Sequence, residues 1–364
     1  MIIMKKNILV VDDSALMRRL ICDIINSDST FQATDVCRDG LEAYEKLKVK
    51  TYDAVILDVN MPRMDGLELL ERLQKDKIRA TIIMVSTLTT KDADVTIRAM
   101  ELGAIDFVTK PCNIIEAKGE EFKGRILRML KAVVRSDNSK TLLNMTPKIV
   151  ETQEQVQVKM PKILERTGST GKNKLVALAC STGGPKALQS VIPYLPVDMN
   201  APMILVQHMP VGFTKSMAER LNEVSKIEVR EAKEGDVLKK GCVYIAPGGK
   251  HMEIQRKADG KHVVRLNDQP AIGGLRPCAN VTYESLRTSS YDEIVCVVLT
   301  GMGSDGTGGI LSLKQKKKIH VISQDAKSCV VYGMPKAIVE AGVVNEVVPL
   351  TEVAHTIIKN VGVQ

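Results

Sequence analysis

The sequence has no tryptophan, and aromatic residues make up only 3% of its 364 residues. Its hydrophobic cores must therefore be built from Val, Ile, Leu, Met and Ala. It also lacks any uninterrupted apolar run of the roughly 20 residues that a membrane span needs, so we expect no membrane insertion. The apolar run "NILVV" begins so close to the N-terminus that no secretory signal fits before it, and we expect a cytoplasmic protein.

The sequence has eight cysteines but no C-x-x-C pair. Several lie inside apolar runs, such as Cys296 in "EIVCVVLT", which favours buried reduced thiols over a disulfide framework or a zinc site. The formal net charge is +8, yet no basic stripe with interleaved aromatic residues accompanies it. We therefore expect no nucleic-acid partner.

The chain divides into two patterned segments and a polar segment between them. Over residues 1–132, short β-rich apolar runs alternate with helical patterns, which predicts a doubly wound parallel sheet covered by helices. Residues 133–172 lose this pattern, contain two prolines and are predicted to be an interdomain linker. The alternation resumes over residues 173–364, where the strand-rich stretch at 227–268 predicts an antiparallel hairpin insertion.

In the first segment, groups suited to phosphoryl chemistry end four of the predicted strands. Asp12 and Asp13 end the first strand, Asp58 the third, Ser86 the fourth and Lys110 the fifth. Three carboxylates at one sheet edge repel one another unless a hard cation such as Mg²⁺ lies between them. Any one aspartate alone is better explained as a helix cap, but the whole set is much harder to explain in that way.

The run "VVDDSALMRRL…LDVNMPRMDGLELL…AMELGAIDFVTKP" closely resembles response-regulator receiver domains over residues 5–127. The resemblance implies a flavodoxin-like fold with Asp58 as the phosphoacceptor, Lys110 beside the phosphoryl group and a histidine kinase as phosphodonor. Ser86 is the expected switch hydroxyl, rather than its neighbour Thr87, because it directly follows the apolar strand. The implied Mg²⁺ ligands are Asp12, Asp13, Asp58 and the backbone of Asn60.

In the second segment, the stretch "ACSTGG" at 179–184 follows an apolar run and precedes a helical pattern. It is close to the G-x-S-x-G nucleophile elbow, but Ala179 stands where the first glycine is expected. Ser181 is therefore either a nucleophile or only the cap of the next helix. Cys180 is a competing nucleophile, but it belongs to the apolar strand, and we favour Ser181.

Serine catalysis needs a base and a group that orients the base. All five histidines lie in this segment, and His208 ends the strand "PMILVQH" at the sheet edge expected for Ser181, with His251 as the rival. Asp305 lies in the Gly-rich loop "GMGSDGTGG" after another strand. That loop lacks the Lys-Ser/Thr ending of a P-loop and the G-x-G-x-x-G pattern, which disfavours nucleotide binding. The predicted triad, in the order Ser181, His208, Asp305, differs from the α/β-hydrolase order.

Six segments of this region are similar to the chemotaxis protein-glutamate methylesterase family, CheB: "STGGPKAL", "VQHMPVGFT", "GDVLKKGCVYIAPGGKH", "LRPCANV", "LTGMGSDGTGG" and "DAKSCVVYGMPKAIVEAG". The resemblance implies a Rossmann-like catalytic domain with the triad Ser181, His208 and Asp305, and backbone oxyanion donors at Thr182 and Met302. Ala179 departs from the family's usual glycine.

The activity implied by this resemblance is hydrolysis of glutamyl methyl esters on methyl-accepting chemotaxis receptors, together with deamidation of receptor glutamines. The esterase reaction needs no cofactor. The unphosphorylated receiver is expected to cover the catalytic cleft, and phosphorylation of Asp58 to relieve that block. The alternative is a response regulator whose output is binding of DNA or protein, which for DNA requires a helix-turn-helix or winged-helix domain.

Overall fold

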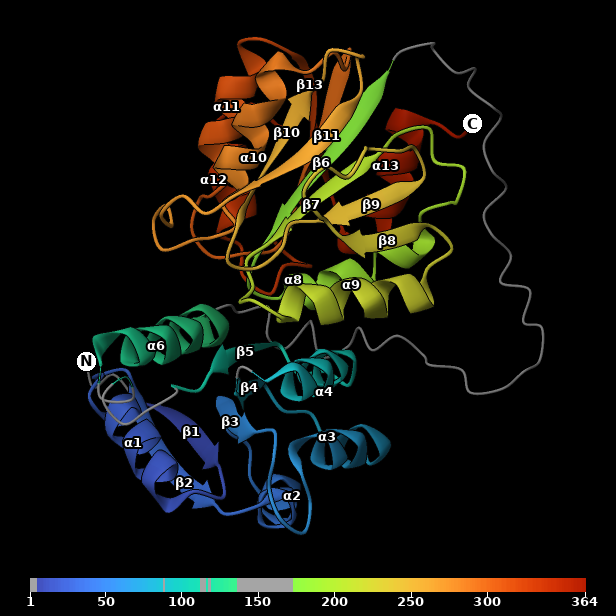
Figure 1. The fold of residues 1–364 in the computed structure, drawn as a ribbon. Helices are drawn as coiled ribbons and strands as arrows, with labels where there is room; N and C mark the ends of the chain where they lie inside the picture. Colours follow the sequence, from blue (N-terminus) through green and yellow to red (C-terminus); the bar gives the residue numbers. More distant parts are fainter. Residues whose placement is uncertain (1–4, 88, 112–115, 117–118, 136–172) are drawn as a thin grey trace, which may run out of the picture.

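The computed structural model describes residues 5–87, 89–111, 116, 119–135 and 173–364 of the chain. It contains two parallel sheets flanked by helices, which confirms the predicted α/β class with two domains (Figure 1). The linker predicted at 133–172 lies outside the described residues except for its first three positions, which belong to the last receiver helix. Within the described ranges, no helix is both long and apolar enough to cross a membrane.

The first domain is a five-stranded sheet in the order β2-β1-β3-β4-β5, with all strands parallel. Its elements are β1 (Lys6–Val11), α1 (Ala15–Asn26), β2 (Phe31–Cys37), α2 (Gly40–Val49), β3 (Ala54–Asp58), α3 (Gly66–Lys75), β4 (Ile82–Ser86), α4 (Thr90–Glu101), β5 (Asp106–Thr109) and α6 (Glu120–Arg135).

The strands β3 and β4 of this sheet are buried along their whole length, as expected for strands covered by helices on both faces. The helices carry the signals that start them. Asp65, for example, accepts a hydrogen bond from the backbone N–H of Glu68, and the Glu68 carboxylate accepts one from the N–H of Asp65. This capping box starts α3 directly after the loop that follows β3.

The second domain contains a seven-stranded sheet in the order β14-β13-β12-β6-β7-β9-β8, again parallel throughout. Its strands are β6 (Lys174–Cys180), β7 (Met203–Gln207), β8 (Glu228–Glu231), β9 (Cys242–Ile245), β10 (His251–Arg256), β11 (His262–Asn267), β12 (Glu293–Val298), β13 (Lys318–Gln324) and β14 (Glu346–Val348). Its α-helices are α8 (Gly184–Gln189), α9 (Phe213–Val224), α10 (Ala279–Ser285), α11 (Thr307–Lys314), α12 (Met334–Glu340) and α13 (Val353–Val361).

The predicted hairpin is shorter than the strand-rich stretch 227–268. Only β10 and β11 pair in an antiparallel way, as a separate two-stranded sheet. The strands β8 and β9 instead extend the large parallel sheet, because β9 is buried along its length and pairs with β7. The sequence expectation is therefore correct for residues 251–267 and wrong for the strands before them.

The two domains pack directly against each other, with α4, β5 and α6 of the first facing α8 and α9 of the second (Figure 1). One cluster of buried apolar side chains includes Ile97 and Phe107 from the first domain and Phe213 and Leu221 from the second. The Phe107 and Phe213 rings are stacked with centroids 4.4 Å apart. The domain interface is thus continuous with the hydrophobic core.

Candidate functional site

The three predicted triad residues follow three neighbouring strands. Ser181 follows β6, His208 follows β7, and Asp305 lies in the loop after β12. These strands are adjacent in the sheet order β12-β6-β7, where chain connections run to opposite sides of β6. Ligands of open parallel sheets bind at such a point, beyond the carboxyl ends of the strands.

His208 and Asp305 are in contact: His208 Nε2 lies 2.8 Å from Asp305 Oδ2. The other donors to this carboxylate are the backbone N–H groups of Ala279 (2.6 Å), Asn280 (3.0 Å) and Gly306 (2.9 Å), and the Cys278 thiol (3.1 Å). Burial alone raises the pKa of Asp305, but the hydrogen bond from His208 and the backbone donors outweigh it and lower the pKa to about 2. Asp305 is therefore ionised and fixed toward the imidazole.

Ser181 lines the same cavity as His208, a space of about 190 Å³. Its backbone N–H donates to Thr300 O at 3.0 Å, which fixes the turn after β6. Within the described ranges, no hydrogen bond joins the Ser181 hydroxyl to His208. Such contacts are often loose in free enzymes and tighten when substrate binds.

In the "ACSTGG" turn, the two positions that only glycine can occupy without strain are the last two, Gly183 and Gly184. Gly183 has φ of 76°, and a Cβ on Gly184 would lie 1.9 Å from Gln207 Oε1. Ala179 instead belongs to β6, is fully buried, and is not among the residues with positive φ. The Ala179 methyl group therefore introduces no backbone strain.

The competing candidates for the nucleophile and the base, Cys180 and His251, lie in environments that do not suit those roles. Cys180 is fully buried, its thiol donates to Gln207 Oε1, and burial raises its pKa, so the reactive thiolate is disfavoured. His251 Nε2 is hydrogen-bonded to Pro270 O, and His262 Nε2 accepts the backbone N–H of Ser290. Neither histidine lines the cavity that contains Ser181. All seven cysteines in the described part of the chain are free thiols.

The receiver forms one wall of this cavity. The lining includes β5 residues from Asp106 to Thr109 together with Arg125, Arg128 and Met129 of α6. Asp106 Oδ2 accepts a hydrogen bond from the backbone N–H of Gly183 at 3.2 Å. At the interface edge, Arg220 Nε and a second guanidinium nitrogen pair with both carboxylate oxygens of Glu101, at 2.6 and 3.1 Å.

The second predicted site lies at the carboxyl edge of the receiver sheet. Oxygen atoms of Asp12, Asp13 and Asp58 lie within 4.8 Å of one another. Lys110 Nζ lies 2.7 Å from Asp58 Oδ2 and 2.9 Å from Asp12 Oδ2. Burial raises the pKa of Asp58 to about 6, with the Asp12 charge adding to the shift and Lys110 opposing it. A cluster of hard oxygen ligands with excess negative charge fits Mg²⁺.

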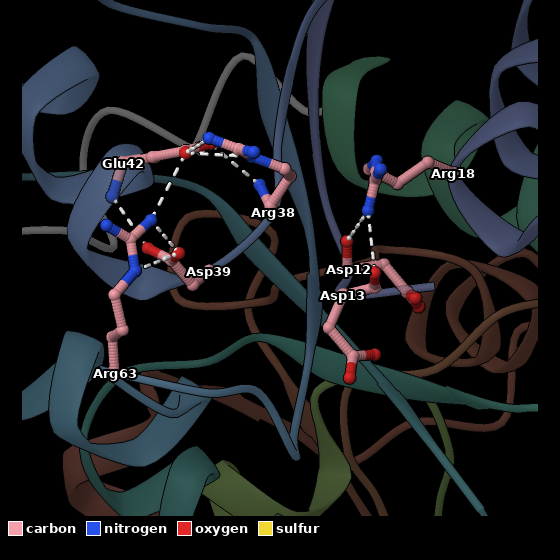
Figure 2. Close-up of polar contacts among 7 residues, drawn as sticks. All are labelled: Asp12, Asp13, Arg18, Arg38, Asp39, Glu42 and Arg63. Atoms are coloured by element: carbon pink, nitrogen blue, oxygen red, sulfur yellow. Dashed lines mark hydrogen bonds and ion pairs between the residues drawn. The ribbon is translucent and has the colours of Figure 1, made fainter. Parts of the chain in front are cut away.

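Figure 2 shows two separate sets of polar contacts in this domain, one at Asp12 and Asp13 and the other around Arg63. Arg18 donates to the backbone carbonyls of Asp12 and Asp13, at 2.7 and 2.8 Å, rather than to their carboxylates. Separately, Arg63 pairs with Asp39 and Glu42 and so ties the loop after β3 to the start of α2. That loop begins one residue after Asp58, so these contacts support the backbone beside it.

The remaining predicted receiver residues have partners in α4 or beside it. The Ser86 hydroxyl accepts a hydrogen bond from the Thr96 hydroxyl at 2.9 Å. The Thr87 hydroxyl donates to Asp92, and the Asn60 side-chain amide donates to the same carboxylate at 2.8 Å. The roles given to Ser86, Lys110 and the Asn60 backbone stay predictions.

Two groups of contacts were missed by reasoning from the sequence. The donors of Cys278, Ala279 and Asn280 to Asp305 come from "LRPCANV", a segment that had shown similarity but no role. The contact of Asp106 with Gly183 joins residues 77 positions apart in different domains. No local pattern signals such a contact, because it depends on how the domains pack.

Comparison with known proteins agrees with this architecture. The family model described as CheB methylesterase matches residues 176–357, and the response regulator receiver domain model matches residues 8–118. The chain belongs to the CheB methylesterase family. The alternative of a regulator with a DNA-binding output has no support, since the second domain is a parallel-sheet domain of this family.

The matches to curated relatives extend over nearly the whole chain. A Pyrococcus horikoshii protein named protein-glutamate methylesterase/protein-glutamine glutaminase is 43% identical over 357 residues, covering 98% of this chain and 94% of its own length. A Bacillus subtilis protein of the same name is 39% identical over 351 residues, covering 96% and 97%. The crystal structure of the Thermotoga maritima CheB methylesterase catalytic domain matches with 40% identity and a TM-score of 0.50, covering 52% of this chain and 99% of that one.

Proposed function

We propose that this protein hydrolyses glutamyl methyl esters on methyl-accepting chemotaxis receptors, and deamidates receptor glutamines, with Ser181, His208 and Asp305 as its triad. The observation that carries the proposal is the His208–Asp305 contact at 2.8 Å beside a cavity that Ser181 also lines. The names of the full-length relatives supply the substrate class. We place the receiver at residues 1–132, the linker at 133–172 and the catalytic domain at 173–364.

The reaction follows from this geometry. Since His208 Nε2 faces Asp305, Nδ1 is the nitrogen left to take the Ser181 proton. The Ser181 oxygen attacks the ester carbonyl carbon, and the carbonyl electron pair moves to oxygen, where the N–H groups of Thr182 and Met302 are proposed donors. When the tetrahedral intermediate breaks down, the electron pair on the oxygen re-forms the carbonyl and the bond to the methoxy group breaks. His208 gives its proton to the departing methoxy oxygen, and methanol is released. Water then attacks the glutamyl-enzyme with His208 as base, and a glutamine side chain would release ammonia by the same path.

Asp305 stabilises the imidazolium that forms in each step. Its pKa, lowered to about 2, keeps it ionised over the whole physiological pH range. The three backbone donors and the thiol hold its carboxylate in place, so the imidazole does not need to reorient when it becomes charged. The esterase chemistry uses only these side chains and water.

We further propose that Asp58 accepts a phosphoryl group from a chemotaxis histidine kinase, with Ser86 and Lys110 contacting that group. Asp12, Asp13, Asp58 and the Asn60 backbone would hold Mg²⁺, which supplies positive charge for the transferring phosphoryl oxygens. Because receiver elements wall the catalytic cavity, receptor helices reach Ser181 only when the domains separate. Phosphorylation of Asp58 would favour that separation.

The decisive measurement is methanol release from membranes that contain methylated receptors, with and without a small phosphodonor and Mg²⁺. We expect the wild type to release methanol and Ser181→Ala to release none beyond background. Ser304→Ala is the matched control, because Ser304 is an exposed serine in the adjacent loop, and it should keep wild-type activity. An active Ser181→Ala variant would overturn the assignment of the nucleophile.

A further inference from the structure

The backbone orientation of the Ser181 turn is set by Thr300. The Thr300 hydroxyl donates to Thr182 O at 2.9 Å and accepts the backbone N–H of Val331 at 3.0 Å. A second carbonyl, Val331 O, lies 3.3 Å from this hydroxyl, but the single proton is better placed for the nearer oxygen. The Thr182 carbonyl therefore points toward the buried Thr300 side chain.

This orientation fixes where the next N–H points. Thr182 C=O and Gly183 N–H belong to one peptide group, and the peptide is trans, so the two bonds point in opposite directions. With the carbonyl held by Thr300, the Gly183 N–H faces the opposite side. There it meets Asp106 Oδ2 at 3.2 Å, and Asp106 and Thr182 both line the cavity that contains Ser181 and His208.

The Asp106 carboxyl oxygen shows what the Gly183 N–H binds. It is an sp² oxygen on a carboxyl carbon, so it stands in for the acyl oxygen of a glutamyl ester, which has the same local chemistry. Asp106 comes from the receiver and would leave with it when the domains separate. The N–H would then be free in a cavity that holds the proposed nucleophile and base.

From this arrangement we infer that the Gly183 N–H is an oxyanion donor in the esterase reaction and that Thr300 is the residue that positions it. The inference rests on the proposed function and adds to the donors at Thr182 and Met302. When Ser181 adds to the ester carbonyl, the negative charge on the acyl oxygen is stabilised by an N–H that is already oriented and costs no reorganisation.

Thr300 is well suited to this positioning role. It is 1% exposed, its backbone N–H donates to Gln324 Oε1 at 2.8 Å, and its carbonyl accepts the Ser181 N–H at 3.0 Å. One residue thus holds the Cys180–Ser181 peptide through its carbonyl and the Thr182–Gly183 peptide through its hydroxyl. Replacing only its hydroxyl leaves the backbone contacts of Thr300 intact, frees the Thr182–Gly183 peptide and removes the acceptor of the Val331 N–H.

The test compares Thr300→Val with Thr300→Ser in the full chain, activated with phosphodonor and Mg²⁺. Valine keeps the size but loses the hydroxyl, whereas serine keeps the hydroxyl. Loss of one oxyanion donor typically costs about 10²–10³ in kcat, and we expect Thr300→Val to lose roughly 10- to 100-fold because the N–H remains but is no longer fixed. KM should change little, and Thr300→Ser should retain most of the wild-type kcat.

A second readout separates oxyanion binding from a general loss of structure. Butylboronic acid forms a tetrahedral adduct with an active serine, and one of its oxygens occupies the oxyanion position. Its inhibition constant for Thr300→Val should rise by about the same factor as kcat/KM falls, as expected when transition-state binding is lost. Both variants should keep the wild-type circular dichroism spectrum, although Thr300→Val should melt at a lower temperature because the buried Val331 N–H loses its acceptor.

Two results would overturn the inference: Thr300→Val with wild-type kcat and boronate affinity, or Thr300→Ser as impaired as Thr300→Val. Failure of the proposed function looks different, since the wild type itself would then release no methanol. The Thr300 comparison is made only on a wild type that is active and a Ser181→Ala variant that is not.

Discussion

Asp58 and Asp305 are both buried aspartates at the carboxyl edges of parallel sheets, yet their acidities shift in opposite directions. Burial raises the pKa of Asp58 to about 6, whereas the pKa of Asp305 falls to about 2 despite burial. The difference lies in the neighbours. Asp58 has Asp12 beside it, one ammonium and one backbone N–H group, whereas Asp305 has His208, three backbone N–H groups and a thiol.

The two environments match two kinds of chemistry. A carboxylate that must accept a phosphoryl group and share a cation benefits from unbalanced negative charge, which Mg²⁺ can neutralise. A carboxylate that only orients a histidine must stay ionised in one position, and fully satisfied oxygens provide that. Burial alone predicts neither role; the count and type of donors around each oxygen does.

The largest loss of activity is expected from Asp305→Asn, which removes the charge of the carboxylate that contacts His208. The three backbone N–H groups that now donate to the carboxylate would face an amide with a single acceptor oxygen, and the imidazolium would lose its counter-charge. We expect kcat for methanol release to fall by about 10³–10⁴, as in other triads that lose the acid. Asp259→Asn, a change on an exposed hairpin tip, should have no effect. Activity above one tenth of wild type would contradict the role of Asp305.

The matching change at the other site is Asp58→Asn. It should abolish the stimulation by phosphodonor and Mg²⁺ while leaving the basal rate unchanged, because the triad is untouched. The measurement is the ratio of methanol release with and without phosphodonor. Asp53→Asn provides a control. Asp53 directly precedes the same strand, β3, and its carboxylate forms an ion pair with Lys6 at the surface. Stimulation that survives in Asp58→Asn would reject it as the phosphoacceptor.

Much of this arrangement could be predicted from local sequence. Apolar runs that end in Asp58, Ser181 or His208 indicate strands, and parallel strands bring their carboxyl ends together. The contacts of Asp305 with Ala279 and Asn280 could not be predicted, because they depend on packing between α10 and the loop before α11. The positions of β8 and β9 in the large sheet could not be predicted either, because the sequence of one strand does not specify which strand it pairs with.

A third buried aspartate, Asp106 of β5, lines the catalytic cavity from the receiver side and tests whether the two domains communicate. Burial raises its pKa to about 7, against hydrogen bonds from the N–H groups of Phe107 and Gly183 and from Thr182. Docking of the receiver therefore favours protonated Asp106. This contribution is complete below the ordinary aspartate pKa near 4 and is lost as pH rises through about 7.

The basal activity should accordingly rise relative to the phosphodonor-stimulated activity as pH increases. Between pH 6 and 8, docking weakens by up to about tenfold. The ratio of basal to stimulated methanol release should rise by no more than that factor, and taking the ratio cancels any effect of pH on the chemical step that both activities share. Asp106→Asn cannot ionise, so its ratio should be flat over this range. A variant with the same slope as wild type would show that another group controls docking.

The smallest expected effect comes from the ion pair between Arg220 on α9 and Glu101 at the end of α4. Its side chains are 37% and 18% exposed, so solvent screens much of the attraction. Either Arg220→Gln or Glu101→Gln should raise basal methanol release by about two- to threefold and leave the stimulated rate unchanged. If the pair acts as a unit, the double variant should match the single variants rather than multiply their effects. If the increase in the double variant is instead the product of the two single increases, Arg220 and Glu101 do not act as a pair. If the stimulated rate changes as much as the basal rate, these residues act on something other than the contact between the domains.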